Sequence, residues 1–368
     1  MSQHSRRASR VLGTRQHRRI GRIGRIGRLA FSSALAAALT AAAAASPSTA
    51  AATAPVAPAP VSIQEWDVPT PNSRPHDPAV APDGALWYTG QMANHLGRLD
   101  PATGQIKEFP LKTPGSGPHG LAADRDGNIW FTAAFKGYIG RLNPETGQIA
   151  EYPLPDPRAR DPHTPVFDQG GILWFTTEQS NFVGRLDPRS GDIRLQMVPT
   201  PHAVPYGIVV TAQGVPYFCE FGANKLASID PRTMAISEVV LPDPAARPRR
   251  LAVAGDGTIY YTDYARGYLG HFDPATRKVE EWPSPGGRDA KPYGIAVTSD
   301  GLVWYSESGV EPNTLVRFEP ATKRFAVAVV PSGGGVIRNM AAAPDGRLYL
   351  ACSGVNKVAV ATPARAGR

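Results

Sequence analysis

Two neighbouring stretches of the sequence carry side chains that can bind a metal ion or move a proton. Their imidazole and carboxylate groups belong to His119, Asp161, His163 and Glu178. Nitrogen and oxygen ligands of this kind together suit a divalent cation, and a histidine can act as a general base near neutral pH. These residues are therefore the first candidates for a metal-assisted or acid–base site. The alternative is structural, because each side chain can equally cap a backbone group of a neighbouring loop.

The four candidates belong to a sequence repeat that recurs every 43–45 residues from Pro75 onward. Its clearest copy contains Pro118-His119-Gly120-Leu121, Ile129-Trp130-Phe131-Thr132, Ile139-Gly140-Arg141-Leu142 and Glu151-Tyr152-Pro153-Leu154-Pro155. Repetition at such a period is typical of propellers and solenoids. Four short apolar runs per copy, separated by Asp-Gly, Gly-Asn or Asp-Pro turn signals, predict strands and not helices. Four antiparallel strands make one blade of a β-propeller.

The number of copies predicts an all-β, seven-bladed β-propeller that forms a single domain over residues 63–363. The seventh copy ends after its third run, at 357–360, and a matching fourth run stands before the first copy, at 63–69. We expect the N-terminal strand to complete the last blade, because such closure removes the exposed edges at the chain's two ends. An open array of repeats would need capping units with a polar outer face, and none is visible.

The position after the recurring proline is polar in every copy and varies around the ring. In chain order it holds His76, His119, His163, Tyr206, Arg249, Tyr293 and Arg338. The first strand of each blade lines the central channel of a propeller, so these side chains are expected at one polar mouth, where ligands bind. Arginines opposite a histidine cluster suit a ligand with a carboxylate or an ester carbonyl. The members other than His119 and His163 are therefore predicted to contact substrate.

Carboxylates end the second apolar run of several copies. Glu220, Asp263 and Glu307 occupy equivalent positions, whereas Glu178 stands one residue later in its copy. A shift of one residue turns a strand side chain to the opposite face of the sheet. We therefore expect Glu178 to point differently from its counterparts.

The repeats resemble those of the streptogramin B lyases (virginiamycin B lyases), which are seven-bladed propellers. In that family one blade carries Pro-His, and the next carries Glu-Pro-His followed by an aromatic strand that ends in a displaced Glu. The matching motifs in this sequence are Pro118-His119, Asp161-Pro162-His163 and Phe175-Thr176-Thr177-Glu178. The resemblance implies a Mg²⁺ ion held by His119, Asp161 and Glu178, with His163 as the proton acceptor.

Two departures from the family pattern affect this assignment. Asp161 is one methylene shorter than the Glu found in the family. The matching motifs lie in the second and third copies of the repeat, whereas in the family they lie in the last two. An end-to-end alignment places Tyr293 and Arg338 where the family has its histidines. The ring symmetry allows the site to occupy another pair of blades.

The resemblance implies a carbon–oxygen lyase that acts in antibiotic resistance. His163 would remove the proton α to the threonyl carbonyl of a cyclic ester or depsipeptide of the streptogramin B type, and the ester carboxylate would leave. Mg²⁺ would act as a Lewis acid on the enolate oxygen. Two alternatives stay open: a metal-dependent lactonase, as in gluconolactonase-type propellers, and a non-catalytic periplasmic ligand-binding or interaction ring, since a fold does not fix a function.

Charge and the N-terminal segment indicate where the protein works. Residues 1–54 contain nine arginines and no acidic residue, so removing those nine charges from the formal +8 leaves −1, and nucleic-acid binding is not indicated. An Arg-rich start, an apolar stretch near 29–45 and small residues around 46–54 predict an export signal with a small-residue linker. Ser5-Arg6-Arg7 resembles a twin-Arg signal. We expect a periplasmic or secreted monomer without a membrane span after signal removal.

Overall fold

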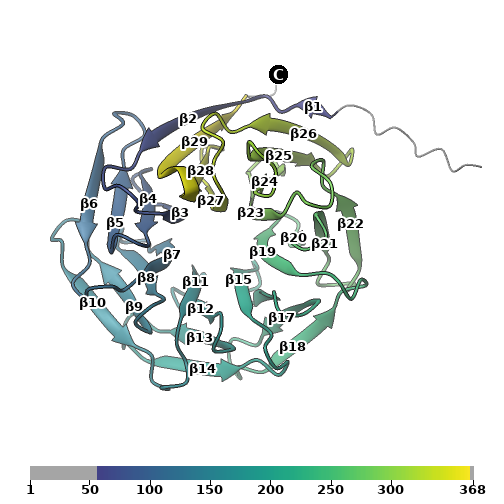
Figure 1. Ribbon diagram of the computed structural model, residues 1–368. Coiled ribbons are helices and arrows are strands. Elements are labelled where there is room, and N and C mark those ends of the chain that lie inside the picture. Colours follow the sequence, from purple (N-terminus) through teal and green to yellow (C-terminus); the bar gives the residue numbers. More distant parts are fainter. Residues whose placement is uncertain (1–55, 365–368) are drawn as a thin grey trace, which may run out of the picture. The chain divides into compact units, whose positions relative to one another are not determined.

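The 43–45-residue repeat folds into seven sheets arranged around a common axis, six with four strands and one with an additional short fifth strand (Figure 1). This computed structural model describes residues 56–364, and the predicted export signal at residues 1–54 lies outside them. In each of the first six blades the strand nearest the axis comes first among the four repeat strands and the other three follow outward, joined by short turns, whereas the seventh blade takes its outermost strand from the start of the ring. The prediction of an all-β, seven-bladed propeller with four antiparallel strands per blade is therefore confirmed.

The strands have nearly constant length from blade to blade. The inner strands are β3 (Pro75–Val80), β7 (Pro118–Ala123), β11 (Pro162–Phe167), β15 (Pro205–Val210), β19 (Pro248–Val253), β23 (Pro292–Val297) and β27 (Ile337–Ala342). The second strands are β4 (Leu86–Gly90), β8 (Ile129–Ala133), β12 (Leu173–Thr177), β16 (Pro216–Glu220), β20 (Ile259–Asp263), β24 (Val303–Glu307) and β28 (Leu348–Cys352). The third strands are β5 (His95–Leu99), β9 (Tyr138–Leu142), β13 (Phe182–Leu186), β17 (Lys225–Ile229), β21 (Tyr268–Phe272), β25 (Thr314–Glu319) and β29 (Lys357–Pro363). The outer strands are β6 (Ile106–Pro110), β10 (Ile149–Pro153), β14 (Ile193–Met197), β18 (Ile236–Val240), β22 (Val279–Pro283), β26 (Arg324–Val329) and β2 (Val61–Asp67).

The ring closes as the incomplete seventh copy predicts. Strand β2 pairs antiparallel with β29, from Val61 opposite Pro363 to Asp67 opposite Lys357, and supplies the outer strand of the seventh blade. The segment before it adds a feature that the sequence did not indicate. A two-residue strand, β1 (Ala57–Pro58), pairs in parallel with β26 and becomes a fifth strand of the sixth blade.

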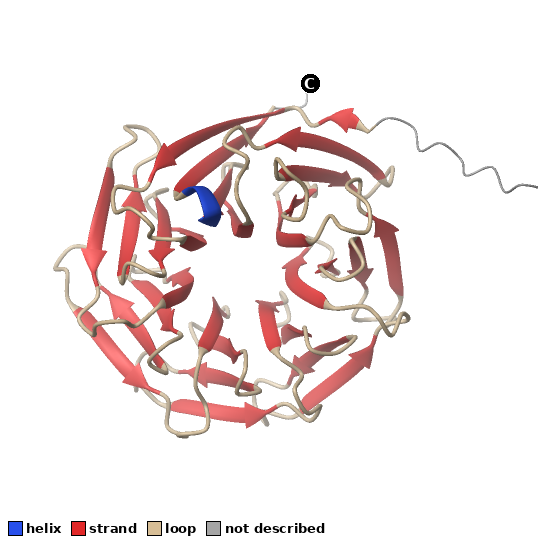
Figure 2. Cartoon of the chain, viewed as in Figure 1, coloured by secondary structure: helices blue, strands red, loops and turns tan. Residues whose placement is uncertain are grey.

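Helical structure is nearly absent from residues 56–364. A single 3₁₀ turn, η1 (Ser353–Val355), follows β28 beside the inner strands (Figure 2). No helix within this range is long and apolar enough to cross a membrane.

The glycine of the Ile-Gly-Arg motif makes room for an aromatic ring of the neighbouring strand. A Cβ atom at Gly140 would lie 2.1 Å from the ring of Phe131, which is fully buried. The same close approach joins Gly97 to Tyr88. Such rings dominate the buried core between blades, because each aromatic side chain removes a large apolar area from water.

The hydroxyl residue of the Trp-Phe-Thr motif ties five of the seven blades to the next one. Thr132 Oγ1 accepts a hydrogen bond from the backbone N–H of Gly120 at 2.8 Å and donates one to the carbonyl oxygen of His163 at 2.7 Å. Thr89, Thr176, Thr262 and Ser306 make the same pair of bonds in their blades. Most of the accepting carbonyls belong to residues directly after the recurring proline, so this bond fixes the backbone of the predicted site residues.

Deleting residues 63–70 is predicted to cause aggregation or a large loss of thermal stability. The deletion leaves the backbone groups of β29 unpaired along one edge, and unpaired strand edges are costly and promote association. Circular dichroism melting and size-exclusion chromatography measure both effects. Removing residues 56–58, which takes away β1, is the matched control and should melt near the full chain. Cooperative melting of the 63–70 deletion near the full chain's Tm would refute this role of β2.

Candidate functional site at the axis of the propeller

The second residues of the seven inner strands meet around the axis, and we call them the first layer. The first layer consists of His76, His119, His163, Tyr206, Arg249, Tyr293 and Arg338. The ring centroids of His76 and His119 lie 3.7 Å apart, and those of His119 and His163 lie 3.8 Å apart. The stack continues to Tyr206, whose centroid is 4.0 Å from that of His163. The Tyr206 hydroxyl in turn bonds the hydroxyl of Tyr293 across the axis.

The first layer is packed more tightly than a polar mouth exposed to solvent. Its three histidines and two tyrosines are buried, while Arg249 and Arg338 are half-buried. Side chains from opposite blades reach one another because the inner strands converge on the axis. The sequence thus indicated correctly which residues gather, and the structure shows that they fill the space they were expected to line.

The three histidines of the first layer are neutral. Burial lowers the pKa of His76, His119 and His163 well below the usual value near 6.5, because a low-dielectric surrounding disfavours the imidazolium form. Nearby positive charges lower it further, with Arg338 foremost for His76 and Arg250 acting on all three. Neutral imidazoles retain one nitrogen lone pair each, which can accept a proton or bind a metal ion.

The next residue along each inner strand forms a second layer that the sequence analysis missed. It consists of Asp77, Gly120, Thr164, Gly207, Arg250, Gly294 and Asn339. Arg250 donates to both Asp77 oxygens at 3.0 and 3.2 Å and to Thr164 Oγ1 at 3.0 Å, which joins three blades. Asn339 Nδ2 donates to Asp77 Oδ2 at 3.1 Å and joins a fourth. A sequence signal for this layer was available: four copies carry a polar residue at the position where the other three carry glycine.

The glycines of the second layer have a steric role. A Cβ atom at Gly120 would lie 2.2 Å from the carbonyl oxygen of His163, so the second and third blades approach as closely as their backbones allow. Glycine and large polar residues therefore alternate over most of the ring, and the large side chains occupy the centre.

Hydrogen bonds connect the two layers at two of the histidines. His76 Nδ1 lies 2.9 Å from Asp77 Oδ1, and since a carboxylate only accepts, this nitrogen carries the proton of the neutral ring. His163 Nδ1 lies 2.8 Å from Thr164 Oγ1. The buried Asp77–Arg250 pair is thereby linked, through Thr164, to the histidine with the predicted catalytic role.

Glu178 lies beside His163, as the displaced position suggested. Its Oε2 is 3.7 Å from His163 Nε2, and its side chain is 28% exposed whereas that of His163 is 2% exposed. Burial raises the pKa of Glu178, and the nearby Asp161 carboxylate adds to the rise. Glu178 is therefore the member of this pair that solvent or a ligand reaches.

Two of the other strand-end carboxylates, Glu307 and Asp263, bind the loops between blades. Glu307 accepts hydrogen bonds from Ser284 Oγ at 2.5 Å and from the backbone N–H of Gly286 at 2.7 Å. Asp263 accepts from the backbone N–H of Arg247 at 3.0 Å. Burial raises the pKa of Glu220 to about 8, and the neighbouring Glu238 adds to this rise. None of these contacts involves a first-layer side chain, which is the difference in direction expected for Glu178.

The residues predicted to hold Mg²⁺ do not form a compact ligand set. The oxygens of Asp161 accept hydrogen bonds from the backbone N–H of Gln179 and from Ser180 Oγ, both in the loop between β12 and β13. Among the described residues, three potential ligands do have donor atoms within 4.8 Å of one another, namely His76, Asp77 and His119. However, Asp77 is already paired with Arg250, and a dication there would be repelled by that buried guanidinium. The arrangement does not fit Mg²⁺, so the metal stays an untested prediction and no step below depends on it.

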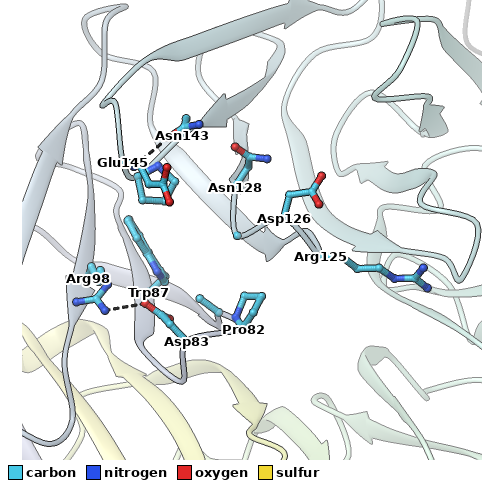
Figure 3. Close-up of a pocket in the computed structure, with 12 residues that line it drawn as sticks. Pro82, Asp83, Trp87, Arg98, Arg125, Asp126, Asn128, Asn143 and Glu145 are labelled. Atoms are coloured by element: carbon cyan, nitrogen blue, oxygen red, sulfur yellow. Dashed lines mark hydrogen bonds and ion pairs between the residues drawn. The ribbon is translucent and has the colours of Figure 1, made fainter.

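A pocket of about 310 Å³ lies elsewhere, between the first and second blades (Figure 3). Its lining includes Trp87, Asn128, Glu145 and the Arg98–Asp83 ion pair, whose charged atoms are 2.7 Å apart. It contains none of the predicted site residues. The axis, where the buried charges and neutral histidines meet, is the better candidate for chemistry.

Replacing Asp77 by alanine is predicted to destabilise the protein by about 3–5 kcal/mol, because it leaves the buried Arg250 charge without a partner. Urea unfolding followed by tryptophan fluorescence measures this free energy. The double variant Asp77→Leu/Arg250→Met should be more stable than Asp77→Ala, since neither charge then remains buried. The exposed ion pair between Lys278 and Glu280 provides a control, because Lys278→Ala should cost less than about 1 kcal/mol. Equal stability of Asp77→Ala and Lys278→Ala would contradict the network.

Comparison with known proteins places the chain in a family. Residues 48–311 match the model of the virginiamycin B lyase family. A solved streptogramin B lyase superposes with a TM-score of 0.75 at 25% identity, over 82% of this chain and 97% of that chain. Virginiamycin B lyase from Staphylococcus aureus superposes with a TM-score of 0.75 at 23% identity, over 82% of this chain and 99% of that chain.

Other propellers share the fold without that closeness. Hydrazine synthase of Kuenenia stuttgartiensis superposes with a TM-score of 0.66 at 16% identity, over 82% of this chain and 98% of that chain. No curated protein matches the chain. Because the family model covers most of the sequence and the repeat folds into the same seven-bladed ring, the chain belongs to the virginiamycin B lyase family.

Proposed function

We propose that this chain is a carbon–oxygen lyase that opens a cyclic ester or depsipeptide by elimination, with His163 as the base. One observation carries the proposal. His163 is neutral, and its buried Nε2 has no hydrogen-bond partner among the described residues while the Glu178 carboxyl group lies 3.7 Å away. A buried nitrogen without a partner is costly to maintain, and such groups cluster where chemistry needs them.

The proposed base requires the tautomer of His163 whose lone pair lies on Nε2. When Nδ1–H donates to Thr164 Oγ1, at 2.8 Å, the lone pair lies on Nε2. Thr164 also accepts from Arg250, so its oxygen is held in place from the second layer. Nε2 then faces the half-buried Glu178, which is where a substrate must approach.

The elimination needs only a base and a group that accepts negative charge. The Cα proton of the esterified residue moves to His163 Nε2, and its bonding electrons form the Cα–Cβ double bond. The Cβ–O bond breaks and its electrons leave with the ester oxygen as a carboxylate. Glu178 would stabilise the imidazolium formed next to it. Arg249, which donates to the Tyr206 hydroxyl at 3.1 Å, is the nearby cation that can stabilise the developing oxygen charge.

The steps above use residues of the chain alone. They also need no nucleophile, which separates elimination from most ester hydrolysis. Family membership supports the reaction class. The location of the site is supported by the match of Pro118-His119, Asp161-Pro162-His163 and Glu178 to the family's motifs.

One observation favours a non-catalytic ligand-binding ring as the second candidate. The side chain of His163 is 2% exposed, so a bulky cyclic peptide reaches Nε2 only if the Glu178 side chain moves aside. A protein that only binds its ligand at the half-buried residues needs no such movement. The products of an incubation with a streptogramin B-type depsipeptide separate these readings: elimination leaves the total mass unchanged, hydrolysis adds one water, and simple binding gives no product.

His163→Ala is predicted to lower kcat/KM for the depsipeptide by about 10²–10⁴, the usual contribution of a general base. Mass spectrometry of the linear product gives the rate. His202→Ala is the matched control, because His202 is exposed and lies outside the first layer. Turnover of His163→Ala at the rate of the unmodified chain would rule out this base. If Tyr293→Ala abolished turnover and His163→Ala did not, the site would lie across the ring.

The pH profile provides an independent test of the same base. A general base works while it is neutral, so activity is lost only as the pH falls through its pKa. Because the pKa of His163 lies well below 6.5, kcat/KM should stay level as the pH is lowered from neutral to 6.5. Stopped assays across this range check the prediction. A fall in kcat/KM centred above 6.5 would show that another group controls the reaction.

A further inference from the structure

The axis carries more positive charge than its carboxylates balance. Four arginines surround it: Arg74, Arg249, Arg250 and Arg338. Of these, Arg250 alone forms an ion pair within the described residues, with Asp77. The remaining three, which we call the arginine cluster, have no carboxylate oxygen within the 4.0 Å of a salt bridge in residues 56–364.

The members of the arginine cluster come from neighbouring parts of the ring. Arg338 lies on β27, which packs directly against β3, and Arg74 immediately precedes β3. Arg249 lies on β19 and reaches over Tyr293 of the blade between, with its Cζ 3.8 Å from that ring's centroid. Electrostatic coupling agrees with this proximity, since burial and then Arg338 lower the pKa of Arg74.

Guanidinium nitrogens in this cluster lack hydrogen-bond partners. The Nε atoms of Arg249 and Arg338 are shielded from solvent and donate to no acceptor among the described residues. A shielded donor of a charged group without a partner costs free energy. An anionic ligand that accepts these hydrogen bonds would remove that cost and balance the charge.

Aromatic rings hold Arg249 in place. Besides Tyr293, its Cζ lies 4.8 Å from the ring centroid of Tyr206, 4.7 Å from that of Phe221 and 4.3 Å from that of Tyr264. Such cation–π contacts orient the guanidinium but do not satisfy its N–H donors. Phe221 and Tyr264 are half-buried, so the same position offers a ligand both a cation and apolar surface.

From this arrangement we infer that the arginine cluster, with Phe221 and Tyr264, is a binding site for a small organic carboxylate that carries an apolar or aromatic body. The planar guanidinium matches a carboxylate through two parallel hydrogen bonds. The aromatic rings accommodate the body, which inorganic anions lack. Glu178 is a carboxyl group close enough to Arg249 to interact with it, and it opposes a second negative charge on the ligand. The inference does not depend on the proposed lyase activity.

Benzoate and benzamide form the sharpest pair of probes, because they share size and shape and differ in charge. Isothermal titration calorimetry with the mature chain at low salt should show saturable benzoate binding and at least about 10-fold weaker benzamide binding, the ratio that corresponds to one charge-assisted contact. Benzoate affinity should fall as salt is added, because screening weakens the attraction. Equal binding of the two probes, or no binding of benzoate, would overturn the inference. Phosphate binding as tightly as benzoate would overturn the carboxylate assignment.

Variants locate the site. Arg338→Gln and Arg249→Met should each weaken benzoate binding by about 10-fold. Arg338→Gln is the safer variant, since Arg338 is half-buried and lacks the aromatic surroundings of Arg249. Arg194→Gln is the control, because Arg194 is exposed on β14 and should leave the affinity unchanged. Unchanged affinity in Arg338→Gln, with a melting temperature like that of the unmodified chain, would refute the site. His163→Ala should still bind benzoate, so loss of turnover and loss of binding remain distinguishable.

Discussion

Ring closure through β2 and β29 is the constraint on which the site depends. Seven residues at the start of the ring pair with seven near its end, from Val61 opposite Pro363 to Asp67 opposite Lys357. Each inner strand reaches the axis only because its blade is held between two neighbours, and closure gives the first and last blades the neighbours they would otherwise lack. Side chains separated by more than 170 positions then meet, as in the bond between Asp77 and Arg250.

The repeated motifs of the sequence have distinct structural roles within that ring. The glycine of Ile-Gly-Arg admits an aromatic ring from the next strand, and the threonine of Trp-Phe-Thr bonds the carbonyl group of the following blade. Both roles are the same in most blades, which explains why these motifs recur. The position after the proline has no such common role, so it is free to vary from histidine to tyrosine to arginine. Chemical individuality therefore concentrates at the axis.

The first layer divides into two sectors with different electrostatic character. His76, His119 and His163 lie next to one another as neutral rings in one sector, while Arg249 and Arg338 belong to the other. Each sector affects the other, because the guanidinium charges help keep the imidazoles neutral. This distribution favours anionic ligands and works against a divalent cation at Asp77. It also places the proposed base near groups that can stabilise negative charge on a substrate.

Family membership and site position do not coincide in a simple way. In this chain the His and Glu motifs that match the family lie in the second and third blades, whereas an end-to-end alignment would place them in the last two. A seven-bladed ring makes such a relocation geometrically permissible, because every pair of adjacent blades presents the same backbone. The location of the proposed base thus rests on the side chains of this chain and not on the family's alignment.

The sequence by itself determined the architecture. Turn residues and apolar runs act locally, so their period of 43–45 residues specified the blade, and the missing fourth run of the last copy specified closure. It also indicated which residues gather at the axis, because each holds the same place in its copy. Only the tertiary structure decided how those side chains are used. The Asp77–Arg250 pair, the burial of His163 and the engagement of Asp161 by Ser180 depend on distances across the ring and on side-chain length. No local pattern encodes such quantities, since they follow from how all seven blades pack together.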